Sequence, residues 1–137
     1  MQQLMTTNVY SVRGRVLIAG TCLDSVWPEA FHKLSENMDN VYGLCLEEGH
    51  LNMAVTKIAA ILGTGQVTEL VFASVDRSPH CVQLHYIRHE IERTMPEHIP
   101  MSSYVVDRGE IVHVPVDAVE LSKSLSALSR LDGMHDG

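Results

Sequence analysis

Three short apolar segments of the chain predict buried β-strands. They cover residues 16–19, 41–46 and 70–75, and the third is a continuous run rich in β-branched and aromatic side chains. Strands that are apolar on both faces are typical of parallel sheets covered by helices. We therefore expect these segments to lie parallel in the interior of one sheet, with their carboxyl ends at the same edge.

Between and after these strands, apolar residues recur with helical spacing. The clearest stripe lies in residues 51–62 and ends at Gly63 or Gly65. Other stripes predict a helix after Cys22 with Pro28 in its first turn, a helix from Cys81 to Met95, and a last helix from Asp117. These helices supply the crossovers that parallel strands require.

Two Arg-Gly sequences are each flanked by a pair of β segments, which predicts two β-hairpins. They lie at 9–12 with 16–19, and at 104–106 with 111–114. The chain then consists of a hairpin, three strand–helix units, and a second hairpin with a helix. This order predicts a single α/β domain over residues 1–137, a three-layer, Rossmann-like arrangement: a mostly parallel sheet, helices on both faces and antiparallel edge hairpins.

Length and charge narrow the function classes. A chain of 137 residues has the size at which one domain buries roughly two-thirds of the surface of its unfolded form. The net charge is −7, and the ten Lys and Arg are scattered. Nucleic acids and anionic membranes bind concentrated basic patches, so we expect neither as a partner.

The apolar runs and the cysteines bear on the cellular compartment. No run reaches the roughly 20 residues needed to span a bilayer, and the first residues do not resemble a signal peptide. The three cysteines are odd in number and far apart in the sequence, which favours reduced thiols over a disulfide framework. We expect a cytoplasmic protein.

The three cysteines are the strongest candidates for chemistry, because each follows a predicted parallel strand. Cys22 ends the first strand, Cys45 lies near the end of the second, and Cys81 with His80 follows the third. Adjacent strands are about 4.8 Å apart, and two thiolates on one tetrahedral ion are roughly 3.8 Å apart, given metal–sulfur bonds of about 2.3 Å. If their strands are neighbours, Cys22, Cys45 and Cys81 can share a zinc ion or an iron–sulfur cluster, with His80 or solvent completing the ligands. The alternative is three separate core cysteines, since cysteine is often buried.

Cys81 also has a case of its own as a catalytic nucleophile. A helix N-terminus favours the reactive thiolate, and Arg77 lies nearby in the preceding loop. His85 and His89 follow Cys81 at i+4 and i+8, so either consecutive pair could hold one ion. We regard these histidines more simply as a solvated or subunit-contacting face. A standard NAD or ATP site is not expected, because neither a GxGxxG sequence nor a P-loop follows a strand.

Three functions remain open from the sequence. The first is a metal or iron–sulfur protein that serves redox or maturation chemistry. The second is a cysteine-dependent enzyme or sulfur carrier that uses Cys81. The third is a non-catalytic oligomeric subunit, because Lys57 is the only charge in the 51–62 helix and a second apolar face surrounds Tyr86. Large apolar surfaces are rarely left in water, so we expect a homo-oligomer or a protein partner.

Overall fold

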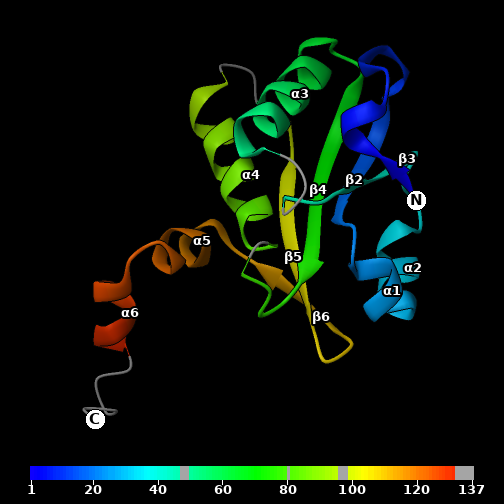
Figure 1. Ribbon diagram of the computed structural model, residues 1–137. Coiled ribbons are helices and arrows are strands. Elements are labelled where there is room, and N and C mark those ends of the chain that lie inside the picture. Colours follow the sequence, from blue (N-terminus) through cyan, green and yellow to red (C-terminus); the bar gives the residue numbers. More distant parts are fainter. Residues whose placement is uncertain (47–49, 80, 96–98, 132–137) are drawn as a thin grey trace.

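The chain folds around a six-stranded sheet (Figure 1). The structure, a computed structural model, describes residues 1–46, 50–79, 81–95 and 99–131. The order of the strands across the sheet is β1-β3-β2-β4-β5-β6. The strands are β1 (Gln2–Gln3), β2 (Gly14–Gly20), β3 (Asn40–Leu44), β4 (Val67–Val75), β5 (Met101–Asp107) and β6 (Glu110–Val114).

Six α-helices and two short 3₁₀ helices are present in the described residues. The α-helices are α1 (Leu23–Val26), α2 (Pro28–Ser35), α3 (Leu51–Gly63), α4 (Gln83–Thr94), α5 (Val116–Ser122) and α6 (Leu125–Leu131). The 3₁₀ helices are η1 (Leu4–Thr6) and η2 (Val9–Ser11).

The predicted parallel core is confirmed. Strand β2 lies between β3 and β4 and pairs parallel with both, so that Ala19 is opposite Gly43 on one side and Ala73 on the other. Strand β5 continues the parallel sheet beyond β4, and β6 is antiparallel to β5. The carboxyl ends of β2, β3 and β4 therefore meet at one edge of the sheet.

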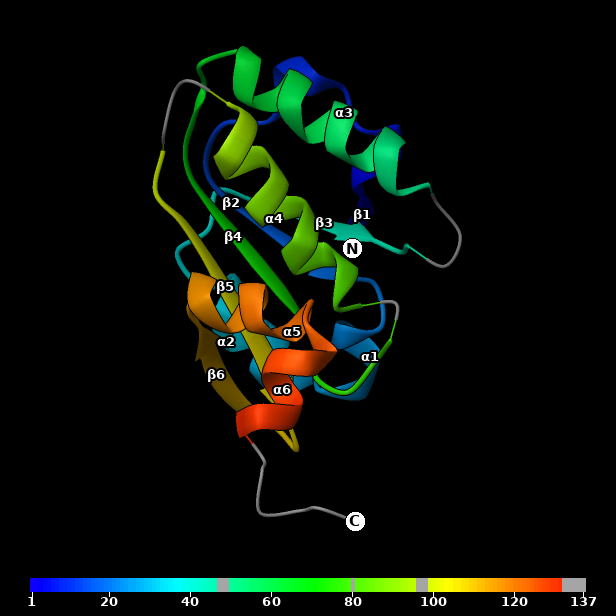
Figure 2. The same ribbon diagram turned by 90° about the vertical axis from the view of Figure 1, so that its left-hand side faces the viewer.

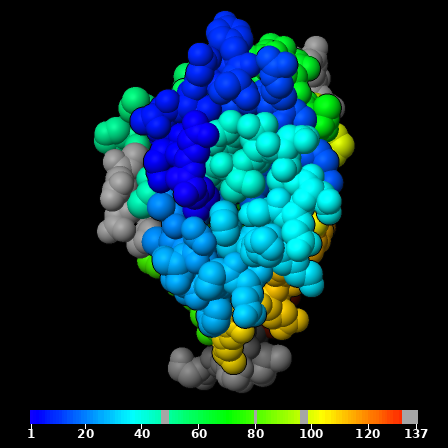
Figure 3. All heavy atoms as spheres, turned by 90° about the vertical axis from the view of Figure 1, so that its right-hand side faces the viewer, coloured from blue at the N-terminus to red at the C-terminus, as the bar shows by residue number. Residues whose placement is uncertain are grey.

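The three layers follow from the alternation of side chains along the central strands. Val16 and Ile18 of β2 pack with α3 and α4 on one face. Leu17 and Ala19 pack with α1 and α2 on the other. The two helical layers lie on opposite sides of the sheet in Figure 1. Figure 3 shows the second side, where residues 20–40, in light blue and cyan, cover the sheet.

The predicted N-terminal hairpin is wrong. Residues 9–11 form η2 instead of a strand, because the side chain of Asn8 accepts a hydrogen bond from Tyr10 N at 2.9 Å and closes a helical turn. The N-terminal contribution to the sheet is β1, which pairs parallel with β3. The sheet therefore has one antiparallel hairpin in the described residues, formed by β5 and β6. Its turn has positive φ at both Arg108 and Gly109, as a two-residue type I′ turn requires.

Two predicted helices are each divided in two. The segment after Cys22 forms α1 and α2, because Pro28 has no N–H with which to continue α1 and instead starts a new helix. The last segment forms α5 and α6, and Ser124 Oγ accepts a hydrogen bond from Ala127 N at 3.1 Å at the start of α6. Figure 2 shows α5 beside α4, with α6 beyond α5.

The face around Tyr86 contacts α5 of the same chain. Tyr86 Oη lies 3.2 Å from Ser122 Oγ, and His89 Nε2 lies 2.5 Å from Glu120 Oε1. Lys123 Nζ lies 5.3 Å from the centre of the Tyr86 ring. This face was expected to meet a second subunit, and the structure covers it intramolecularly. Association of the chain stays a prediction, and helix α3, which also motivated it, leaves Leu51 and Met53 exposed.

No helix among the described residues is both long and apolar enough to cross a membrane.

Among the described glycines, Gly14 has the least room for a side chain. Its φ is +71°, and a Cβ built there would lie 2.2 Å from Asp39 Oδ2, the atom that accepts a hydrogen bond from Arg15 N at 2.8 Å. Gly14→Ala should lower the free energy of unfolding by roughly 1–3 kcal/mol, as measured by urea denaturation. In Gly63→Ala the new methyl group meets nothing within 4 Å, so this matched variant should be neutral or more stable by up to about 1 kcal/mol. Equal effects of the two substitutions would contradict this account of the β2–β3 junction.

Candidate functional site

The three cysteines lie at the same edge of the sheet. Cys22 is two residues beyond β2, Cys45 directly follows β3, and Cys81 lies between β4 and α4. We call the ends of these three strands, together with the loops that follow them, the carboxyl edge. The prediction that β2, β3 and β4 are parallel and present their cysteines at one edge is confirmed.

A backbone hydrogen bond joins the segments that carry Cys22 and Cys45. Thr21 N donates to Leu44 O at 3.3 Å, and each cysteine is the next residue along its own segment. The carbonyl of Cys22 accepts hydrogen bonds from Val26 N and from Ser25 Oγ, both at 3.0 Å, as α1 begins. Cys22 is exposed and Cys45 is half-buried, so the thiol of Cys22 can reach solvent-borne ligands.

Cys81 lies near the end of β2, on the side of β4. A Cβ built on Gly20, the last residue of β2, would lie 3.4 Å from Cys81 Sγ and 3.9 Å from Ser74 Cβ. Gly20 thus leaves room for the thiol over the junction of β2 and β4. Helix α4 begins at Gln83, so Cys81 lies in the preceding turn instead of opening the helix. Its carbonyl accepts a hydrogen bond from Leu84 N at 3.1 Å.

The described side chains do not form a finished metal site. Among them, no group of three or more His, Cys, Asp or Glu side chains is placed to hold one ion. His80, which the sequence analysis named as a further ligand, lies outside the described residues, as does most of the acidic loop after Cys45. Metal binding by Cys22, Cys45 and Cys81 therefore stays a prediction.

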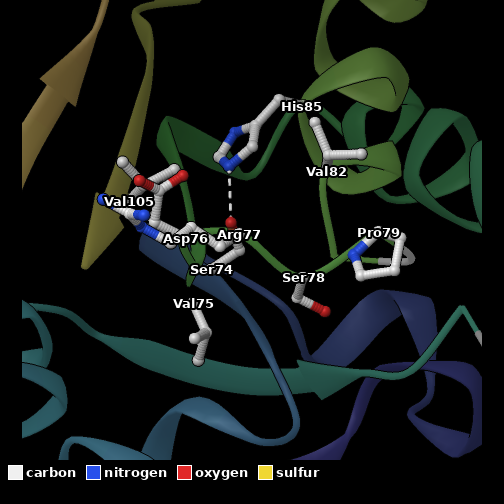
Figure 4. Close-up of a pocket in the computed structure, with 9 residues that line it drawn as sticks. All are labelled: Ser74, Val75, Asp76, Arg77, Ser78, Pro79, Val82, His85 and Val105. Atoms are coloured by element: carbon white, nitrogen blue, oxygen red, sulfur yellow. Dashed lines mark hydrogen bonds between the residues drawn. The ribbon is translucent and has the colours of Figure 1, made fainter. Parts of the chain in front are cut away.

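A pocket of about 310 Å³ lies at the end of β4, lined in part by Pro79 and Val82 on either side of the Cys81 turn. Figure 4 shows it between the β4–α4 loop, the first turn of α4 and β5. Asp76, Arg77 and Ser78 supply polar groups from the loop, while Val82 and Val105 supply apolar surface. Arg77 Nε lies 3.4 Å from Asp107 Oδ1, so this guanidinium is engaged by the end of β5.

A buried hydrogen bond between Ser74 and His85 lies in the wall of this pocket. Ser74 Oγ is 2.8 Å from His85 Nε2, and the two residues are 1% and 2% exposed. Burial, and after it the positive charge of Arg88, lower the pKa of His85 to about 4, while the negative charge of Asp76 acts in the opposite direction. At neutral pH the imidazole is therefore uncharged. It can accept a proton in a hydrogen bond from Ser74, or donate one, but it cannot supply a positive charge.

The position of His85 differs from the sequence-based interpretation. His85 and His89 were expected to share a solvated or subunit-contacting face, but His85 faces β4 while His89 contacts Glu120 and Lys123 of the C-terminal segment. The two rings are thus committed to different neighbours, which argues against one ion held between them.

Arg88 provides a second buried polar contact between α4 and the sheet. Its Nη1 donates to Ser103 Oγ at 3.2 Å, its Nη2 donates to Met101 O at 3.1 Å, and its Nε lies 2.5 Å from Glu92 Oε1. Together with the His85–Ser74 bond, these contacts hold α4 across β4 and β5. The Ser74–His85 and Ser103–Arg88 contacts share one sequence signal. In each, a serine lies in a buried strand, and its partner is a polar residue beside the apolar stripe of the helix that packs on that strand.

The order of the strands defines where ligands bind in a sheet of this kind. The chain passes from β2 to β3 on one side and then crosses to β4 on the other side. In open α/β sheets, ligands bind at the carboxyl ends of the strands where the order reverses. Here that point lies between β2 and β4, under Cys81 Sγ.

A comparison with protein families agrees with this topology. The family model described as Rossmann-like domain matches residues 12–133. The chain belongs to the Rossmann-like domain family. No curated protein and no solved structure matched the chain. For this Rossmann-like domain, the function must therefore be argued from the carboxyl edge itself.

The low pKa of His85 makes stability depend on pH. In the unfolded chain His85 binds a proton near pH 6.5, and in the folded protein only near pH 4. The contribution of His85 to the free energy of unfolding is therefore fully present above about pH 6.5. It is lost as the pH falls towards 4, by roughly 3 kcal/mol in total. Urea denaturation of the wild type and of His85→Gln, at several pH values between 7 and 4, measures this loss of stability. The wild type should lose stability more steeply, and parallel curves would contradict the buried, neutral imidazole.

Proposed function

We propose that this domain binds a transition-metal ion or an iron–sulfur cluster through the thiolates of Cys22, Cys45 and Cys81, and serves redox chemistry or the maturation of another protein. One observation carries the proposal. In the parallel order β3-β2-β4, the segments that carry Cys45 and Cys81 flank the segment that carries Cys22, at the edge where the strand order reverses between β2 and β4. Thiolates are the ligands that zinc and iron–sulfur clusters prefer.

The distances that binding must bridge are short. Thiolates that share one tetrahedral ion lie roughly 3.8 Å apart, close to the strand separation of about 4.8 Å. Cys22 lies two residues beyond Gly20, at most about 7 Å along the chain, and Cys81 Sγ already lies over Gly20. Cys45 follows Leu44, which is paired with Gly20 across the β2–β3 ladder.

Binding would complete the site by drawing these segments together. Each thiol loses its proton as its sulfur becomes a ligand, so affinity rises with pH. Three thiolates leave a fourth position on a tetrahedral centre, for which we propose His80 or solvent. Reduced thiols persist in the cytoplasm, where we place the protein.

Replacement of single cysteines tests this function. Protein purified without oxygen should contain zinc, or iron with acid-labile sulfide, in stoichiometric amount. Cys22→Ser, Cys45→Ser and Cys81→Ser should each lose most of it, and combined replacements should lose little more, because the ligands of one centre act as a unit. The measurement is metal and sulfide content per chain, with circular dichroism to verify the fold.

His50→Gln is the matched control for these variants. His50 is an exposed residue in the loop after β3, immediately before α3, and it is a histidine that the proposal does not assign as a ligand. This variant should retain full metal content. Wild-type protein that holds neither metal nor sulfide after anaerobic reconstitution would refute the proposal, and so would full retention in any of the three cysteine variants.

A second candidate function uses Cys81 alone, as the nucleophile of a cysteine-dependent enzyme or as a sulfur carrier. The observation that favours it is the place of Cys81, which is half-buried in the turn between Pro79 and Val82, two residues that line the pocket together with Ser74 and His85. A substrate in this pocket would lie near the Cys81 thiol. Arg77 contacts Asp107, so among the described residues the start of α4 is the source of positive charge that we assign to the sulfur.

Alkylation rates separate the two functions. In metal-free protein, Cys81 should react with iodoacetamide faster than Cys45 if it serves as a nucleophile, with Cys22 as the exposed reference. Mass spectrometry of peptides after timed alkylation over a pH series gives the three rates. Equal and slow alkylation of Cys81 and Cys45 would count against the nucleophile, while protection of all three by added zinc would favour the metal centre.

A further inference from the structure

Strand β6 ends the sheet and has a partner on one side only. Its residues pair with those of β5 without interruption, from Val114 opposite Ser103 at one end to Glu110 opposite Asp107 at the hairpin turn. Glu110, Val112 and His113 are exposed, and Val112 retains 40% of its accessible surface. Among the described residues no hydrogen bond from outside the β5–β6 ladder reaches this strand. Its outer edge therefore offers backbone groups that remain to be paired.

The hairpin turn determines which backbone groups point outward. Asp107 and Glu110 flank the two-residue turn, so they form the hydrogen-bonded pair that closes it. Hydrogen-bonded and non-hydrogen-bonded pairs alternate along an antiparallel ladder. Glu110, Val112 and Val114 therefore direct their N–H and C=O groups to β5, while Ile111 and His113 direct theirs away from the sheet.

We infer that β6 pairs antiparallel with β6 of a second copy of this chain, about a two-fold axis at Val112. In this register Ile111 of each copy is opposite His113 of the other, and these are the residues whose backbone groups point outward. Four backbone hydrogen bonds form, two for each Ile111–His113 pair. The two sheets become one continuous sheet.

The side chains of β6 suit this register. The axis brings the exposed apolar Val112 of one copy against that of the other, as a close non-hydrogen-bonded pair. Glu110 lies opposite Val114, so that no like charges face each other across the axis. The strand contains no Lys, no Pro and no bulge, which are three of the devices that keep sheet edges apart. A self-complementary edge of this kind favours a second copy over an unrelated partner.

Charge at the two-fold axis is the first test. Val112→Lys places two ammonium groups directly opposite each other and should raise the dimer dissociation constant by at least about tenfold. Val112→Thr keeps a β-branched residue without charge and should remain dimeric. The measurement is sedimentation or light scattering from 1 to 100 µM, with an expected wild-type mass of twice the 15.2 kDa of one chain.

Removal of an outward N–H is the second test. His113→Pro deletes one donor per copy, and hence two of the four interchain hydrogen bonds, without touching the β5 ladder. His113→Ala controls for the loss of the His113 contact with the Tyr104 ring, whose centre is 5.4 Å away. The Pro variant should be monomeric at concentrations where the Ala variant is dimeric, and hydrogen exchange at Ile111 and His113 should be slow only in dimers.

The results decide the inference in either direction. A concentration-dependent dimer that Val112→Lys and His113→Pro dissociate, with circular dichroism unchanged, supports pairing through β6. A wild-type protein that is monomeric at 100 µM overturns it, and so does a dimer or larger assembly that both variants leave intact.

Discussion

The burial of β2 between β3 and β4 is the constraint on which the rest of the structure depends. Residues 16–19 are at most 1% exposed, because the strand is covered by helices on both faces and by hydrogen-bonded strands on both edges. A strand so enclosed must satisfy its backbone groups within the sheet. The alternation of its side chains then assigns α3 and α4 to one face and α1 and α2 to the other. Parallel pairing also brings Cys22, Cys45 and Cys81 to a common edge.

The continuous apolar runs were sufficient to predict this core, whereas the ends of the sheet were not. Apart from Ser74, residues 70–75 are apolar on both faces, a pattern that few structures other than a buried parallel strand satisfy. The hairpin predicted from residues 9–12 was wrong, because the side chain of Asn8 accepts a hydrogen bond from Tyr10 N and this local bond competes with strand formation. The neighbours of β2 could not be derived from the sequence, since strand order depends on which side of the sheet each crossover takes.

The candidate site was predictable in its place but not in its detail. That each cysteine follows a parallel strand could be predicted from the sequence, because strand ends are marked by the change from apolar to polar residues. The Ser74–His85 bond could not, because counting apolar residues alone assigns His85 to the outside of α4. Polar residues enter a helix–sheet interface when a partner such as Ser74 or Ser103 is present in the strand. That pairing appears only once the helix is placed over its strands.

The central claim is that Cys22, Cys45 and Cys81 converge on one centre at the carboxyl edge. X-ray absorption of zinc-loaded protein measures the ligands of the bound ion directly. The account predicts a shell of about three sulfur atoms at about 2.3 Å, with one nitrogen or oxygen ligand at about 2.0 Å. A shell of nitrogen and oxygen alone, or one with a single sulfur atom, would contradict it.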